Sequence, residues 1–284
     1  MPQNRINRLD QIMRYVMLAV AGMLILLAVL TIVFFATKPA AQPTGSPSGK
    51  PNGGTSAVDT SGGTTGSTLP PTPAGDDVTL PETPDAGVAY QDSIVFVGDS
   101  LTAHLINRGV LTGGRNTKQV WRTENNMLNL NSEVLNAKII FPGTGALMTI
   151  AEAAGKAKPA VLVITLGTDW GVAYLGETDF KACYTKLVTA VQKASPKTTV
   201  VLQSIFPVTA GCTVLDNQKI DTANRWVKAI AAETGCRYLD TQSILKDANN
   251  CLKEEYCNSS DGIHLSENAY TAILTYIRTH AVTD

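Results

Sequence analysis

The sequence is poor in histidine, in cysteine motifs and in clustered basic residues. Its 284 residues include 3 histidines, and the net charge is -1, with no block of Lys and Arg in residues 89–284. A nucleic-acid-binding protein needs such a block to neutralise phosphates, so nucleic acid is not an expected partner. The 5 cysteines lack the Cys-x-x-Cys or Cys/His spacing of zinc sites. Neither a metal nor an organic cofactor is therefore expected.

Charge is also missing from residues 15–36. A membrane-spanning helix needs roughly 20 apolar residues, whereas the apolar stretch of a cleavable signal has about 7–15. We therefore expect a transmembrane signal anchor over 15–36 in preference to a cleaved signal peptide. A buried core helix is a poor alternative, because the stretch has no polar face for solvent. The three arginines in residues 1–14 predict a cytoplasmic N-terminus, a single pass through the cell membrane, and an extracellular remainder.

Residues 37–88 are rich in Thr, Pro, Gly and Ser. Such a composition cannot bury enough apolar surface to offset the entropy lost on ordering. We expect a disordered linker that tethers residues 89–284, which are enough for one domain with a full core. A coil of about 50 residues reaches roughly 40 Å, so the domain would stay close to the membrane.

The cysteines all lie in the part of the chain expected outside the cell. Cys251 and Cys257 are close enough in sequence to close a small loop, and they could form a disulfide there. Cys183 lies in a helical pattern and is expected to be a small core residue. Because the number of cysteines is odd, at least one thiol is free.

Short apolar runs alternate with amphipathic stretches in residues 89–284. The runs are too short for helices and predict buried strands over 93–97, 136–141, 160–166, 198–205 and 236–240. The amphipathic stretches predict helices over 151–157, 179–194, 216–234 and 266–280, the last with Ser266 as its N-cap. Strands that alternate with helices form a parallel sheet covered on both faces, so the expected fold class is α/β.

Three glycine-containing turns follow predicted strands directly. They are Gly98-Asp99-Ser100, Gly143-Thr144-Gly145 and Gly167-Thr168-Asp169. In open parallel sheets, binding sites form beyond the carboxyl ends of the strands. We therefore expect all three turns to lie on one rim of the sheet.

A serine and a histidine are the candidate catalytic groups on that rim. Ser100 follows the first strand, and a serine hydroxyl becomes a nucleophile when a base takes its proton. Histidine suits this task because its pKa lies near the working pH. His264 is the preferred base, since Asp261 precedes it by three residues and can orient its ring. His104, one turn beyond Ser100, is the less favoured alternative, and His280 is expected in solvent.

The motif Gly-Asp-Ser-Leu at 98–101 and the motif Asp-Gly-Ile-His at 261–264 together resemble those of the SGNH (GDSL-type) hydrolases. The resemblance covers residues 93–280. It implies a flavodoxin-like three-layer α/β/α sandwich whose members hydrolyse or transfer acyl esters of lipids, carbohydrates and other alcohols. It also assigns the roles of nucleophile, general base and orienting acid, in that order, to Ser100, His264 and Asp261.

The resemblance further implies an oxyanion hole, with one departure from the family pattern. Backbone N–H groups of Ser100 and Gly145 would donate to the oxyanion, with Gly143 as the alternative to Gly145. Asp169 stands where the family has an asparagine, and a carboxylate accepts hydrogen bonds where the amide donates. Three interpretations stay open: Asp169 is protonated by burial and donates, it points away, or the site is impaired and kept for binding.

These features predict an extracellular, membrane-tethered serine esterase that forms an acyl-enzyme. Its expected partner is an acylated small molecule or an acylated carbohydrate of the cell envelope, such as an O-acetylated sugar. An acetyltransferase would use the same residues, with a sugar hydroxyl in place of water. The alternative is a catalytically impaired surface module that binds a glycan or a partner protein through the same rim. Trp121, Trp170 and Tyr174 could then stack against the ligand.

Overall fold

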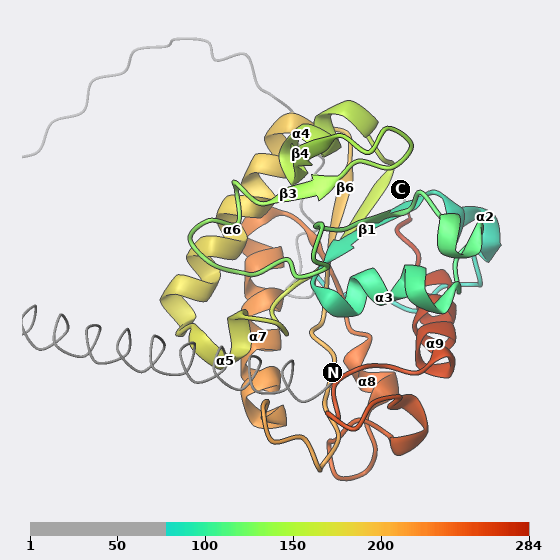
Figure 1. The fold of residues 1–284 in the computed structure, drawn as a ribbon, viewed down its shortest axis with the longest axis vertical. Coiled ribbons are helices and arrows are strands. Elements are labelled where there is room, and N and C mark those ends of the chain that lie inside the picture. Colours follow the sequence, from blue (N-terminus) through green and yellow to red (C-terminus); the bar gives the residue numbers. More distant parts are fainter. Residues whose placement is uncertain (1–77, 284) are drawn as a thin grey trace, which may run out of the picture. The chain divides into compact units, whose positions relative to one another are not determined.

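The computed structural model describes residues 78–283 (Figure 1). The signal anchor predicted over 15–36 and most of the predicted linker lie outside the described residues. In the part of the chain that is described, no helix is both long enough and apolar enough to cross a membrane.

A five-stranded parallel sheet lies at the centre of the domain, in the order β2-β1-β5-β6-β7. Its strands are β1 (Ile94–Gly98), β2 (Val120–Trp121), β5 (Val161–Thr165), β6 (Thr199–Gln203) and β7 (Arg237–Leu239). Numbered along the chain within this sheet alone, the order is 2-1-3-4-5, which is the flavodoxin-like order. The sheet confirms the predicted fold class.

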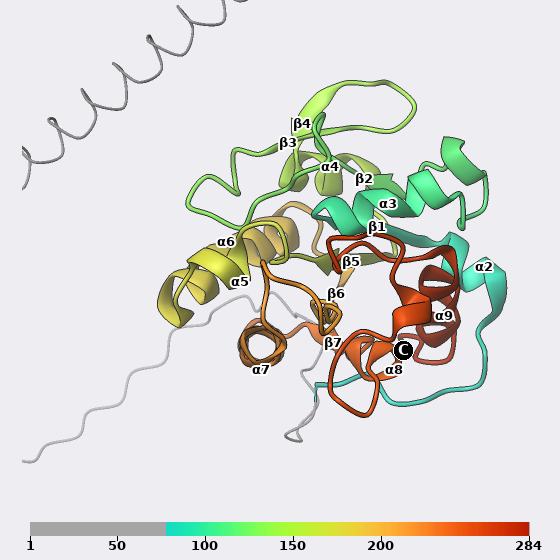
Figure 2. The same cartoon turned by 60° about the horizontal axis from the view of Figure 1, so that its bottom comes forward.

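Helices cover both faces of the sheet and complete the predicted three-layer α/β/α architecture (Figure 2). One face carries α4 (Ile150–Ala157), α6 (Glu177–Ala194) and α7 (Asn217–Thr234), and the other carries α3 (Ser100–Arg108) and α9 (Glu267–Arg278). The shorter elements are α2 (Gly87–Asp92), α5 (Gly171–Tyr174), α8 (Gln242–Leu245) and the 3-10 turns η1 (Gly114–Asn116) and η2 (Glu254–Tyr256).

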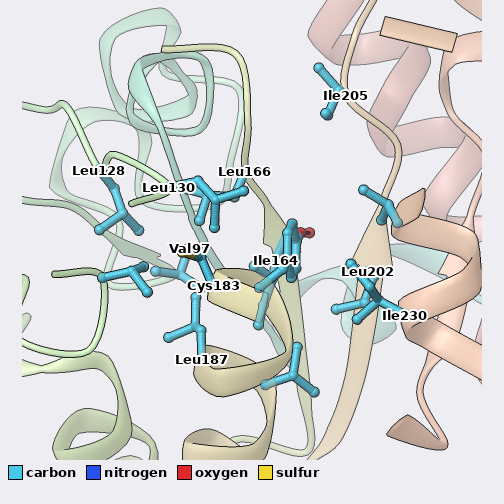
Figure 3. Close-up of a cluster of buried hydrophobic side chains, with 14 of the residues drawn as sticks. Val97, Leu128, Leu130, Ile164, Leu166, Cys183, Leu187, Leu202, Ile205 and Ile230 are labelled. Atoms are coloured by element: carbon cyan, nitrogen blue, oxygen red, sulfur yellow. Dashed lines mark hydrogen bonds between the residues drawn. The ribbon is translucent and has the colours of Figure 1, made fainter. Parts of the chain in front are cut away.

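Alternate side chains of each strand supply two separate cores. Val97 and Ile164 pack with side chains of α6 and α7 (Figure 3), whereas Phe96 and Val163 pack with side chains of α3 and α9. Each of these four side chains is at most 2% exposed. Burial of a side chain of this size contributes about 1.5–3 kcal/mol, so both helical layers are held firmly to the sheet. Cys183 lies in the first core, as predicted.

Most predicted elements are present with nearly the predicted bounds. Four of the five predicted strands lie in the parallel sheet, and all four predicted helices form. Ser266 caps α9 as predicted, because its Oγ accepts a hydrogen bond from the Ala269 N–H at 3.3 Å. Asp216, predicted as the first helical residue, is instead the N-cap of α7.

The strand predicted over 136–141 belongs to a different sheet. Its observed part, β3 (Lys138–Ile140), pairs antiparallel with β4 (Leu147–Thr149), and the turn between them holds Gly143 and Gly145. The place beside β1 is taken by β2, which was not predicted, because two apolar residues between polar neighbours give no periodic signal. The prediction that all three glycine turns share one rim was therefore wrong for this turn.

The folded domain also begins earlier than residue 89. Val78 and Leu80 are buried, and their backbone groups pair with Tyr238 of β7. The Leu80 N–H donates to the Tyr238 carbonyl at 2.8 Å, and the Tyr238 N–H donates to the Val78 carbonyl at 2.9 Å. Residues 78–88 are thus part of the domain, and their assignment to the disordered linker was wrong. The apolar side chains of this short segment are separated by Thr and followed by Pro, which hid them in the linker composition.

All five cysteines are free thiols, so the disulfide considered between Cys251 and Cys257 is not formed. Cys257 pairs antiparallel with Leu265, whereas Leu252, the neighbour of Cys251, pairs antiparallel with Lys246. The Cys251 thiol lies 3.6 Å from the Asn249 carbonyl oxygen, and the Cys257 thiol lies 3.2 Å from that of Ser259.

Candidate active site

Ser100 is the first residue of α3, directly beyond the carboxyl end of β1. A glycine is required at position 98, because a Cβ there would lie 2.0 Å from the Thr165 carbonyl oxygen of the neighbouring strand. Asp99 is the N-cap of α3, and its Oδ1 accepts a hydrogen bond from the Leu101 N–H at 3.3 Å. This turn presents the partly buried Ser100 at the sheet rim, as predicted.

Asp99 also joins the ends of β1 and β5. It is completely buried, and its Oδ2 accepts a hydrogen bond from the Thr168 N–H at 2.9 Å. Burial, and then the nearby charge of Asp169, raise the pKa of Asp99 to about 7. The sequence indicated Asp99 only as part of a turn. Its position before a predicted helix was a signal for a cap, but its burial beside a second carboxylate left no signal in the sequence.

His264 and Asp261 form the hydrogen-bonded pair that was predicted. The Nδ1 of His264 lies 2.6 Å from the Oδ2 of Asp261. Burial disfavours the Asp261 charge, but hydrogen bonds from the Ile263 N–H and the His264 ring outweigh it and lower the pKa of Asp261. A carboxylate here requires the proton on Nδ1, which leaves Nε2 of His264 as the proton acceptor.

Gly262 allows the loop to turn between this acid and this base. Its φ is +73°, and a Cβ would lie 2.4 Å from the Thr209 Oγ1. The Thr209 N–H donates to the Gly262 carbonyl at 2.9 Å. Any other side chain at position 262 would displace the loop that carries Asp261 and His264.

The loop that carries Asp261 and His264, called the histidine loop below, packs against α3, which begins with Ser100, although the two are far apart in the sequence. The ring centroids of His264 and His104 are 4.7 Å apart. His104 lies four residues after Ser100, on the same face of α3. Burial, then the charges of His264 and Arg108, lower the pKa of His104, which disfavours a charged ring where it packs against the predicted base. The spacing of Ser100 and His104 was the only sequence signal for this contact.

Arg108, one further turn along α3, fixes the same loop, and sequence analysis missed it. With the Asn258 amide oriented so that its oxygen faces the helix, Oδ1 accepts hydrogen bonds from both terminal nitrogens of Arg108 at 2.7 and 3.1 Å. The Asn258 N–H in turn donates to the His264 carbonyl at 2.9 Å. A second link comes from α9, where the Tyr270 hydroxyl donates to the Leu101 carbonyl at 2.6 Å.

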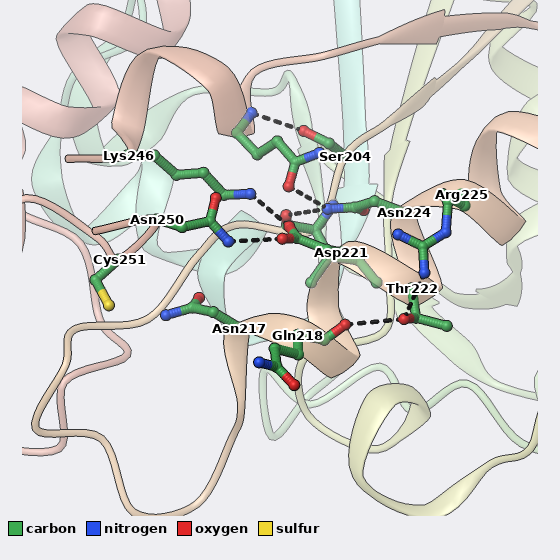
Figure 4. Close-up of polar contacts among 12 residues, drawn as sticks. Ser204, Asn217, Gln218, Asp221, Thr222, Asn224, Arg225, Lys246, Asn250 and Cys251 are labelled. Carbon is green, nitrogen blue, oxygen red and sulfur yellow. Dashed lines mark hydrogen bonds and ion pairs between the residues drawn. The ribbon is translucent and has the colours of Figure 1, made fainter. Parts of the chain in front are cut away.

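A polar cluster on α7 anchors the segment that leads into the histidine loop (Figure 4). Asp221 pairs with Lys246 through Oδ1 and accepts a hydrogen bond from Asn250 at 2.7 Å through Oδ2. Nearby, the Asn224 amide donates to the Ile205 carbonyl and to the Gln242 side chain, both at 2.9 Å. These contacts fix the segment before the loop that carries Asp261 and His264 against α7.

Asp169 faces Ser100 and accepts hydrogen bonds from both of its donors. The Ser100 N–H donates to Oδ2 at 2.9 Å, and the Ser100 hydroxyl donates to Oδ1 at 2.8 Å. The interpretation in which Asp169 points away is therefore wrong. The hydroxyl is directed at this carboxylate, and the carboxylate holds the N–H that was predicted to stabilise an oxyanion.

Gly145 does not join this site. It lies in the exposed turn between β3 and β4, and its N–H donates to the Phe141 carbonyl at 3.0 Å. The prediction of Gly145 as an oxyanion donor was wrong, and the alternative, Gly143, lies in the same exposed turn. The error arose because the strand predicted over 136–141 was expected in the parallel sheet. The strand next to β1 is instead β2, and the residues that follow it at the rim are 122–126.

The three aromatic candidates for ligand stacking differ. Trp121 is 2% exposed within the core, so the interpretation of this residue as a ligand platform was wrong. Trp170 and Tyr174 are 40% and 65% exposed, and their rings stack with centroids 4.4 Å apart. Trp170 directly follows Asp169, so this exposed pair lies next to the candidate site along the chain.

Residues 96–272 match the model of the GDSL-like Lipase/Acylhydrolase family. The match spans both Ser100 and His264 and more than half of the chain. This chain therefore belongs to the GDSL-like lipase/acylhydrolase family. Within residues 78–283, no group of three or more His, Cys, Asp and Glu side chains is arranged to hold a metal ion.

No curated protein matches the chain. Similar solved structures include a proposed platelet activating factor from Streptococcus pneumonia, with 20% identity, a TM-score of 0.49, and coverage of 66% of this chain and 82% of that one. A GDSL-like lipase from Bacteroides thetaiotaomicron has 17% identity, a TM-score of 0.46 and coverage of 66% and 87%. The periplasmic domain of a Salmonella Paratyphi A lipopolysaccharide acetyltransferase has 13% identity, a TM-score of 0.46 and coverage of 65% and 82%.

Proposed function

We propose that this chain is a serine esterase that cleaves acyl esters of cell-envelope carbohydrate, such as O-acetylated sugars. Membership of an acylhydrolase family supports the ester chemistry. The single observation that carries the assignment of residues is the Asp261–His264 pair, with 2.6 Å between Oδ2 and Nδ1, packed against the helix that begins with Ser100.

In the proposed reaction, the Ser100 hydroxyl turns from Asp169 toward Nε2 of His264. His264 takes the hydroxyl proton as Oγ bonds to the acyl carbon, and Asp261 stabilises the imidazolium. The alkoxy C–O bond then breaks, and the departing alcohol oxygen takes the proton from His264. Water, activated by the same histidine, releases the acyl group; a sugar hydroxyl in place of water would make the enzyme a transferase.

The proposed location is the outer face of the cell membrane. The uncharged stretch 15–36 supports a membrane anchor, and the composition of 37–77 supports a flexible tether. Such a tether would keep the domain near envelope carbohydrate. Protease treatment of intact cells tests this: the domain should be cleaved while the N-terminus remains protected.

Labelling with an organophosphonate ester tests the proposed nucleophile directly. We expect wild-type protein to be labelled on Ser100 and to hydrolyse short acyl esters, including acetylated sugars. Ser100→Ala should lose both the label and the hydrolysis while retaining its thermal unfolding transition. A folded wild-type protein with neither label nor turnover would remove the case for an esterase.

The second candidate function is a non-catalytic surface module that binds a glycan or a partner protein. Two observations favour it: the Asp169 carboxylate holds both donors of Ser100, and the exposed Trp170–Tyr174 stack provides a flat apolar surface. Glycan binding that persists in Ser100→Ala and disappears in Tyr174→Ala, without turnover by wild type, would select this function.

A further inference from the structure

We propose that Asp169 selects esters that carry an ammonium group close to the ester carbonyl, and that binding of this cation releases Ser100 for reaction. The proposal rests on the proposed esterase function and names its substrate class. It places the ammonium group on the acyl side of the ester, as in an aminoacyl ester, and expects neutral acetyl esters to react more slowly.

Asp169 occupies both hydrogen-bond donors of Ser100. Its two oxygens lie 2.8 and 2.9 Å from the Ser100 hydroxyl oxygen and backbone nitrogen. Reaction requires both of these donors elsewhere: the hydroxyl proton must reach His264, and the N–H must be free for the developing oxyanion. A carboxylate left in this position would also repel the oxyanion, so the productive state needs Asp169 to move.

Asp169 has no basic partner in an ion pair among the described residues. Its side chain is partly buried. Arg108, on the same helix as Ser100, is occupied by Asn258. Burial lowers the pKa of His104 and so disfavours its charged form, and the neighbour of Asp169 is another acid, Asp99. A partly desolvated carboxylate gains from a cation, and the partial exposure of Asp169 lets a ligand reach it.

Binding of one cation to Asp169 would free both donors of Ser100. An ammonium group on the acyl chain attracts the Asp169 carboxylate away from Ser100. The Ser100 N–H then becomes available to the carbonyl oxygen, and the hydroxyl can turn to Nε2 of His264. A neutral acyl group offers no such attraction, so Ser100 is released less often and the ester reacts more slowly. The aspartate that departs from the family's asparagine thereby becomes a device for substrate choice.

The chemical step is that of the proposed function. Oγ of Ser100 forms a bond to the aminoacyl carbon, the alkoxy C–O bond breaks, and the proton passes from Oγ through His264 to the leaving alcohol. Water then cleaves the aminoacyl-enzyme to the free amino acid. No oxidant, reductant or metal is required.

Two esters of matched shape test the proposal: the ethyl esters of alanine and of lactic acid, which differ in an ammonium against a hydroxyl. At pH 6.5 the amino group is charged, because an α-amino group has a pKa near 8. The full-length protein is compared with Asp169→Asn, which keeps the shape and removes the charge. Asp179→Asn removes an exposed charge from α6 and serves as the control for net charge.

We expect wild type and Asp179→Asn to prefer the alanine ester, and the ratio of kcat/KM for the two esters to fall about tenfold or more in Asp169→Asn. A ratio that is unchanged in Asp169→Asn overturns the proposed substrate class, while Ser100-dependent turnover of either ester leaves the esterase function standing. Phosphonate labelling of Ser100 without turnover of either ester also overturns the substrate class alone. Absence of both labelling and turnover in wild type and Asp169→Asn overturns the proposed function itself.

Discussion

Two carboxylates, Asp261 and Asp169, hold the two halves of the proposed catalytic pair, and their effects are opposite. Asp261 lies 2.6 Å from the Nδ1 of His264 and favours the imidazolium that forms when the base takes a proton. Asp169 lies 2.8 Å from the Oγ of Ser100 and holds the hydroxyl away from that base. The same functional group therefore supports the reaction in one place and restrains it in the other, because only its hydrogen-bond partner differs.

The strongest test of this comparison is Asp261→Asn. The Oδ1 contact to the Ile263 N–H can be kept by the amide oxygen, but the amide nitrogen would donate to Nδ1 of His264. The ring would then carry its proton on Nε2 and could not accept one from Ser100. The corresponding change in a serine protease lowers kcat about 10⁴-fold. We expect a fall of roughly 10³–10⁴ in kcat for ester hydrolysis, with retained folding by circular dichroism; a fall of less than about tenfold would contradict the role of Asp261.

The opposite outcome is expected for Asp169→Asn with neutral esters. An amide at this position can donate to an oxyanion, and one such donor contributes roughly 10²–10³ in rate. We expect kcat/KM for a neutral acetyl ester to rise by up to about 10²-fold in this variant, measured with Asp179→Asn as the control. A fall of similar size would mean that the carboxylate assists the reaction of neutral esters, and the contrast with Asp261 would disappear.

The sequence predicted these two carboxylates to different degrees. The Asp261–His264 pair lies within one short loop, so its hydrogen bond follows from local spacing. Ser100 begins α3 just beyond β1 and Asp169 lies in the turn after β5, so the direction of the Asp169 side chain toward Ser100 depends on the register of β1 against β5. A residue list cannot supply that register, and for this reason the orientation of Asp169 stayed open until the structure was known.

The fold shows the same division between local and non-local information. The strands were predicted from short continuous apolar runs and the helices from apolar residues at helical spacing, and both signals are local in the sequence. The two-residue β2 and the pairing of Ile140 with Leu147 depend on contacts made after the sheet has formed. The prediction of Gly145 as an oxyanion donor was wrong because the strand before it, predicted over 136–141, was assigned to the parallel sheet. The hydrogen bonds between Arg108 and Asn258 were not predicted, because the two residues are far apart in the sequence and meet only in the folded domain.

Substitution of Arg108 should disturb the position of the Asp261–His264 pair without changing either residue, and with a smaller effect. Its two hydrogen bonds to Asn258 hold the loop of His264 against α3. Displacing a base by ~1 Å can cost up to about 10²-fold in rate. We expect Arg108→Met to lower kcat about tenfold with little change in KM. Arg108→Lys, which keeps the charge but not the paired geometry, should restore part of the loss. If kcat falls equally in both variants, the paired hydrogen bonds alone matter and the charge of Arg108 does not. If kcat is unchanged in both, Arg108 does not position the loop of His264.

The smallest expected effect concerns Asp99, the acid behind Asp169, and it appears in stability. Burial and the Asp169 charge raise the pKa of Asp99 to about 7 from an ordinary value of 3.8. The folded state therefore binds a proton that the unfolded state has released between about pH 4 and pH 7. The resulting stabilisation is fully present below pH 4 and is lost as the pH rises to 7. Asp99→Asn does not titrate, so the free energy of unfolding of wild type minus that of the variant should fall over this range.

Comparing the two proteins removes the contributions of groups that they share, including His104, whose lowered pKa acts in the opposite direction. Thermal unfolding at pH 5 and pH 7.5 measures the difference. We expect it to shrink by about 1 kcal/mol or more, which corresponds to about 2–4 °C in Tm for a domain of this size. The free energy of unfolding of the double variant Asp99→Asn/Asp169→Asn should depend on pH as that of Asp99→Asn does. In Asp169→Asn alone it should depend on pH less than in wild type, because one cause of the raised Asp99 pKa is gone. A difference that stays constant with pH would show that Asp99 is ionised throughout, and that the two neighbouring acids both carry charge beside Ser100.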